Sequence, residues 1–125
     1  MTLTEARDQL RSDLLAVAAA VLPGEEGLVV HDPGPVDPGA LFDGRGPATI
    51  CTITVETGDP ARTDAAAEYV ETAANALRSA GWQVDVPPVE SGHHRVAAHR
   101  EGFDVAVHAF DSDWRVTLTG QTPEL

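Results

Sequence analysis

The spacing of apolar residues in the last third of the chain is the feature that most constrains its fold. From Trp82 onwards apolar residues alternate with polar ones, whereas in the segments 2–22 and 66–80 they recur every three or four residues. Alternation places every second side chain on the same face of a strand. Glu101-Gly102 is typical of a two-residue hairpin turn, because glycine accepts positive φ. We therefore predict consecutive, largely antiparallel strands at 82–86, 94–100, 103–110 and 114–119.

Two helices are predicted before these strands. In the first helix, Thr2 followed by Glu5 is typical of a capping box at the N-terminus. Apolar residues with helical spacing follow it. For the second helix we expect Asp59 as the N-cap, Pro60 at the first helical position and Gly81 just past the end. The apolar stripe of this second helix is expected to comprise Ala66, Val70, Ala73, Leu77 and Ala80.

Two further segments lie between the predicted helices. The segment 49–55 is rich in β-branched residues and is predicted to be a strand with Cys51, Ile53 and Val55 on one face. The stretch 23–47 holds five of the nine prolines and six of the eleven glycines, which indicates a long surface loop. Residues 28–30 are a candidate short strand within that loop.

Together these elements predict one α+β domain over residues 1–125, in the order α-β-α-β-β-β. The expected architecture is a two-layer α/β sandwich with both helices on one face of a mostly antiparallel sheet. The strand-helix-strand step through the second helix should cross right-handed. A chain of 125 residues is long enough for one hydrophobic core and is of ordinary size for a single domain.

The hairpin turns also predict which strand residues face one another. Turns at 101–102 and 112–113 place Val107 opposite Val96 on one side and opposite Leu118 on the other. This register keeps the apolar residues on one face, and a one-residue slip would turn them to solvent. The outer face is then expected to carry His93, Arg95, His99, Asp104, His108, Phe110, Arg115 and Thr117.

This outer face gathers the side chains best suited to binding. Four of the five histidines fall between residues 93 and 108. His93 and His108 are expected to be diagonal neighbours, but no third ligand is evident and the nearby arginines oppose a cation, so no metal site is predicted. His99 opposite Asp104 is expected to be a surface pair. We predict a binding surface of His93, Arg95, His99, His108, Phe110 and Arg115, with no catalytic residue and no cofactor.

The charge balance restricts the partners. The chain has 20 acidic residues and 8 basic ones, all arginine, for a formal net charge of −12. Such a surface repels phosphate backbones and anionic lipid, so we expect a protein partner, no nucleic acid and no membrane insertion. The first residues lack the basic start of a secretory signal. We therefore expect a cytoplasmic location, with an extracytoplasmic one as the alternative if a signal or lipid-attachment segment precedes this sequence.

Three segments carry a family resemblance: Gly81-Trp82-Gln83-Val84, Arg100-Glu101-Gly102-Phe103-Asp104-Val105 and Thr119-Gly120-Gln121-Thr122-Pro123. With the order of the elements, they resemble a group of small actinobacterial proteins, most of them predicted lipoproteins of unknown function. The resemblance covers nearly the whole chain and brings no catalytic residues. It implies a disulfide between a first-strand cysteine and one after the C-terminal Thr-Pro. Cys51 matches the first position but Glu124 stands at the second, so the partner for a disulfide is missing. Because Cys51 lies on the core-facing side of its predicted strand, we expect it to be an inert, buried thiol.

Three functions remain open at this point. The first is a non-enzymatic binding or protein-interaction module, which is our main expectation. The second is an immunity-like or antitoxin-like protein that neutralises a basic toxin, because complementary charge would speed that association. The third is a small ligand-binding or metal-binding domain that uses the histidine-rich face of the sheet.

Overall fold

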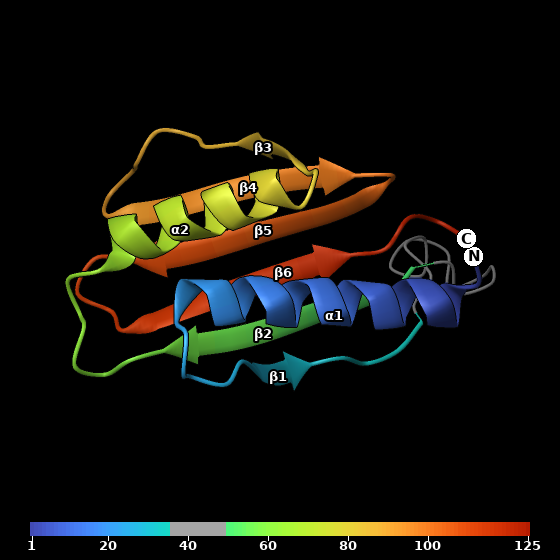
Figure 1. Ribbon diagram of the computed structural model, residues 1–125, viewed down its shortest axis with the longest axis horizontal. Helices are drawn as coiled ribbons and strands as arrows, with labels where there is room; N and C mark the ends of the chain where they lie inside the picture. Colours follow the sequence, from blue (N-terminus) through green and yellow to red (C-terminus); the bar gives the residue numbers. More distant parts are fainter. Residues whose placement is uncertain (36–49) are drawn as a thin grey trace.

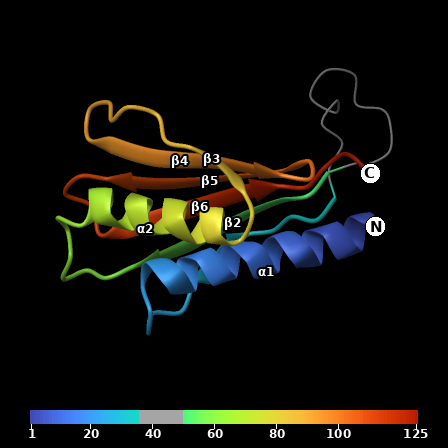
Figure 2. The same ribbon diagram turned by 45° about the horizontal axis from the view of Figure 1, so that its top comes forward.

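Two helices pack on one face of a six-stranded sheet in the computed structural model, which describes residues 1–35 and 50–125. The elements are α1 (Leu3–Val21), β1 (Leu28–His31), β2 (Thr52–Gly58), α2 (Ala66–Ser79), β3 (Gln83–Asp85), β4 (His93–Arg100), β5 (Phe103–Phe110) and β6 (Arg115–Gln121). Figures 1 and 2 show both helices on the same side of the sheet, and no described element covers the other side. The predicted two-layer α+β architecture is confirmed.

The strands lie in the order β1-β2-β6-β5-β4-β3, and all neighbours are antiparallel. The predicted order α-β-α-β-β-β was short by two strands. It left out β1, and it gave three strands after α2 although four segments were predicted there and four are present. β1 forms at the candidate segment 28–30, and residues 36–47 of the predicted loop lie outside the described part of the chain. The connection from β2 through α2 to β3 crosses right-handed, as expected (Figure 1).

The predicted register of the last three strands is confirmed. Val107 of β5 pairs with Val96 of β4 and with Leu118 of β6. The turn residues Glu101 and Gly102 have φ of 51° and 86°, which is the conformation that a two-residue hairpin requires. The strand predicted at 49–55 is observed as β2, from Thr52 to Gly58. It continues to Gly58 because β6 pairs with it over that whole length. Residue 49 lies outside the described residues.

The two helix starts differ from each other. At α1 the predicted cap is confirmed, since the Thr2 hydroxyl oxygen accepts a hydrogen bond from the Glu5 backbone N–H at 3.1 Å. At α2 the predicted cap was wrong, because the helix begins at Ala66. Asp59 instead closes a turn of its own, in which its carboxylate accepts from the Ala61 N–H at 3.0 Å. Aspartate side chains that bond to the backbone in this way compete with helix formation.

The end of α2 follows the predicted pattern. Gly81 takes a φ of 90°, its N–H donates to the Arg78 carbonyl at 3.1 Å, and the Trp82 N–H donates to the Leu77 carbonyl at 3.0 Å. These two bonds are those of a Schellman cap. The cap leads the chain directly into the core, where Trp82 is buried.

The core lies between the helices and the inner face of the sheet. Leu10 and Leu14 of α1 are fully buried against it, and so are Cys51, Ile53 and Val55, as the alternation predicted. The α2 stripe is buried except for its last member, Ala80, which is exposed. The buried apolar side chains contributed by β4, β5 and β6 are Val96, Ala98, Phe103, Val105, Val107, Ala109, Val116 and Leu118.

Candidate functional site

The outer face of the sheet carries the predicted binding residues. In β4, β5 and β6 every second residue is buried under the helices, and the residues between them point away. Successive side chains of a strand point to opposite faces. All six predicted site residues lie an odd number of positions from the buried residues of their strand, so they point outward. They are His93, Arg95, His99, His108, Phe110 and Arg115.

Three of these side chains form one packed cluster. His93 Nε2 lies 2.8 Å from His108 Nδ1, which is hydrogen-bonding distance. The His93 ring also stacks on Phe110, its cross-strand partner, with a centroid separation of 4.4 Å and an interplanar angle of 11°. Phe110 remains 49% exposed. A large aromatic ring is thus held in a fixed orientation at the surface.

The hydrogen bond in this cluster constrains protonation. One imidazole must donate its N–H and the other must accept it with an unprotonated nitrogen. Burial lowers the pKa of His108, and the charges of His93 and Arg95 lower it further. His108 therefore favours its neutral form, which suits a role as one partner of an imidazole–imidazole bond.

Trp114 lies beside Arg115 and was not predicted as a site residue. A Cβ on Gly58 of β2 would come within 2.8 Å of Trp114 Cε3, so the indole lies against this glycine. The Arg115 guanidinium carbon lies 5.4 Å from the centre of the indole ring, and Trp114 remains 37% exposed. We call the following residues the aromatic–arginine patch: His93, Arg95, His108, Phe110, Trp114 and Arg115.

His99 is not part of this patch. It lies four residues along β4 from Arg95, a separation of about 13 Å in an extended strand. His99 Nδ1 forms a hydrogen bond with the carboxylate of Asp104, its cross-strand partner, and the two side chains are 60% and 57% exposed. An ion pair as exposed as this contributes little energy. His99 and Asp104 border a shallow depression of about 450 Å³ floored by Ala97, Ala106 and Thr119.

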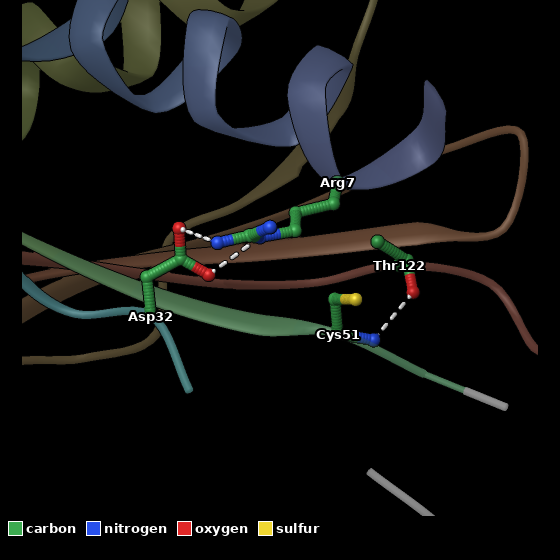
Figure 3. A network of polar contacts seen from close by, with 4 residues as sticks. All are labelled: Arg7, Asp32, Cys51 and Thr122. Carbon is green, nitrogen blue, oxygen red and sulfur yellow. Dashed lines mark hydrogen bonds and ion pairs between the residues drawn. The ribbon is translucent and has the colours of Figure 1, made fainter. Parts of the chain in front are cut away.

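Cys51 lies in the inner layer, away from the patch. Its side chain is fully buried, and burial raises the pKa of the thiol. Its backbone N–H donates to the Thr122 hydroxyl at 2.9 Å, and the Thr122 N–H donates to the Cys51 carbonyl at 3.0 Å (Figure 3). Thr122 is thus the residue opposite Cys51, whereas Glu124 is two residues further along and exposed. A buried thiol with a raised pKa is a poor nucleophile.

An ion pair beside Cys51 joins α1 to the end of β1. Arg7 Nε and Nη2 donate to the two carboxylate oxygens of Asp32 at 2.8 Å and 2.9 Å, a bidentate arrangement (Figure 3). The side chain of Asp32 is only 11% exposed. The hydrogen bonds from Arg7 lower the pKa of this carboxyl. The geometry is that of a structural clamp, because two parallel charge-assisted hydrogen bonds join the two elements.

Within residues 1–35 and 50–125, no three His, Cys, Asp or Glu side chains gather closely enough to hold a metal ion between them. In the same part of the chain, neither helix has the length and apolar character required to cross a bilayer.

Comparison with known proteins shows a shared fold. No protein-family model matches the chain, and no curated protein matches it in sequence. The structure is similar to the crystal structure of the putative lipoprotein LppA from Mycobacterium tuberculosis, with a TM-score of 0.65 and 18% sequence identity. The similarity covers 98% of this chain and 77% of the other. The expected resemblance to actinobacterial lipoproteins is thus supported at the level of the fold.

Proposed function

We propose that this domain is a non-enzymatic binding module that takes a protein partner on the aromatic–arginine patch. The observation that carries the proposal is the position of Phe110, which is half-exposed yet stacked on His93. An ordered aromatic ring loses little conformational freedom when a partner covers it. Aromatic and arginine side chains are also the types enriched at the centres of protein interfaces.

The charges of the patch indicate the chemistry of the partner. Arg95 is exposed and forms no ion pair with any residue of 1–35 or 50–125. Among the described residues, the Arg115 guanidinium has only a long ion-pair contact, from Nε to the Asp113 carboxylate at 3.5 Å. Two cations beside exposed aromatic rings suit a partner that presents carboxylates next to apolar side chains. The same cations disfavour a basic toxin at this surface.

The titratable groups outside the patch support a non-enzymatic role. His99 and Asp104 are both more than half exposed, so water screens their interaction. Cys51, the sole thiol, is buried under α1 with a raised pKa. Catalytic groups are more often found where a cavity excludes water and shifts the pKa values of neighbouring side chains.

The fold also bears on where the domain acts. Its similarity to a lipoprotein supports the extracytoplasmic alternative over the cytoplasmic location that the sequence favoured. We therefore propose that the patch meets its partner outside the cytoplasmic membrane. Fractionation of the producing cells tests this, because the protein should be found with the membrane or secreted fraction.

Affinity purification with patch variants tests the proposed function. Purified wild-type protein, Phe110→Ser and Arg95→Ser are immobilised and exposed to extract from the producing organism, and the bound proteins are quantified. Val30→Ser is the matched control, because Val30 is 45% exposed but lies on the edge strand β1, which carries no residue of the patch. A partner retained by wild type and Val30→Ser but lost from both patch variants supports the proposal. Equal retention by all four proteins would contradict it.

A further inference from the structure

We propose that His93 and His108 together chelate a divalent transition-metal ion, with Cu²⁺ bound more tightly than Zn²⁺. The two histidines come from neighbouring strands, and His93 Nε2 faces His108 Nδ1 across the hydrogen bond described above. Imidazole is a preferred ligand for both ions, and Cu²⁺ stands above Zn²⁺ in the general order of affinity. The inference is independent of the protein-binding role, because it needs no partner.

The separation of the two nitrogens fits one shared ion. Metal–imidazole bonds are about 2.0–2.1 Å long, so two of them at a right angle place their nitrogens about 2.9 Å apart. The observed separation is 2.8 Å. The imidazole that donates the hydrogen bond would change to the tautomer with its N–H on the other ring nitrogen, with no net loss of a proton. Each ring would then turn about its χ2 bond so that both lone pairs meet at the metal.

The scaffold around the two rings favours a chelate over two separate sites. Both histidines lie within regular, paired strands, so their backbones stay at a fixed distance. The two rings are already in contact, with centroids 5.1 Å apart and planes inclined by 20°. When one imidazole holds the ion, the second is therefore present at a high effective concentration.

The surroundings also limit the site. Arg95 pairs with His108 across the strands, and its positive charge weakens the binding of any cation. Two protein ligands leave the remaining coordination positions of the metal to water, or to a carboxylate brought by a partner. The expected complex is therefore an open, exchangeable site, in contrast to a closed structural site with four protein ligands.

Titration of the metal-free protein with CuCl₂ and with ZnCl₂, followed by calorimetry, tests the inference. The variants are His93→Gln and His108→Gln, which keep hydrogen-bonding capacity at each position. His99→Gln is the matched control, because His99 lies on the same face of β4 but away from the pair. Circular dichroism confirms that each variant is folded. Electron paramagnetic resonance of the Cu²⁺ complex reports how many nitrogens bind the ion.

The expected result is one Cu²⁺ per chain with a spectrum of two imidazole nitrogens. Each of the two pair variants should weaken Cu²⁺ binding by about tenfold or more, because the second imidazole no longer contributes. His99→Gln should bind as wild type does. Folded pair variants that bind Cu²⁺ as tightly as wild type, or a spectrum of a single nitrogen, would overturn the inference.

Discussion

Leu10 of α1 lies directly against Gly120 of β6. A Cβ added to Gly120 would come 2.6 Å from Leu10 Cδ1, which is closer than any real contact allows. Leu10 is fully buried, so its side chain cannot swing out to solvent. The helix layer can therefore approach the sheet at this point only because residue 120 has no side chain.

Gly120→Ala should for this reason destabilise the protein. Overpacking of a close-packed core typically costs about 1–3 kcal/mol, and urea denaturation measures the change in the free energy of unfolding. In a Leu10→Ala background the same substitution should cost less, because the space it needs has been opened. Costs that add without coupling would show that the close contact is not the cause.

The Arg7–Asp32 clamp should make stability depend on pH. The pKa of Asp32 is lowered in the folded state, so the unfolded state binds the proton more readily. The stabilisation is present above the unfolded value of about 3.9 and is lost as pH falls through the folded pKa. Asp32→Asn should lower stability at neutral pH and flatten its decline in acid.

The matched control for the clamp is Glu68→Gln. Glu68 also pairs with an arginine at 2.8 Å, but its side chain is 65% exposed. Because solvent screens an exposed pair, this variant should leave stability and its acid dependence close to those of wild type. Chemical denaturation at several pH values separates the two variants. An equal effect of both would contradict the assigned role of the Asp32 contact.

The imidazole pair should be visible in the titration of His108. Its pKa is expected below the ordinary value of about 6.5. Since the folded state disfavours the proton, stability should rise with pH through this range and be fully present above the ordinary value. His93→Ala exposes His108 and removes a neighbouring charge, so the pKa of His108 should move upward. NMR of the imidazole protons measures it, and a downward shift would contradict the pairing.

The sequence predicted the parts of the fold that depend on local spacing. Alternation and a Glu-Gly turn determine the pairing of Val96 with Val107, because a slip would expose the core face. The prediction of Asp59 as a helix cap was wrong. Its carboxylate accepts a hydrogen bond from the Ala61 N–H, and the helix begins only at Ala66. Local signals of this kind compete, and the sequence does not show which one prevails.

The position of the candidate residues on the outer face was predicted, but their contacts were not. Alternation places His93 and Phe110 on one face, yet their stacking depends on side-chain rotamers that no spacing rule specifies. Trp114 was missed because its position depends on Gly58, a residue of a strand that is distant in the sequence. For the same reason, the pairing of Cys51 with Thr122 could not be read before β2 and β6 were placed side by side.

Site-specific photo-crosslinking tests the proposed binding face most directly. A photoreactive phenylalanine analogue replaces Phe110 and keeps an aromatic ring there, and the same analogue at Ser12 or Val30 probes the exposed side of α1 or the far edge of the sheet. After irradiation in the producing cells, the account predicts a specific protein adduct at position 110 and none at positions 12 and 30. Adducts at the two control positions with none at position 110 would contradict it.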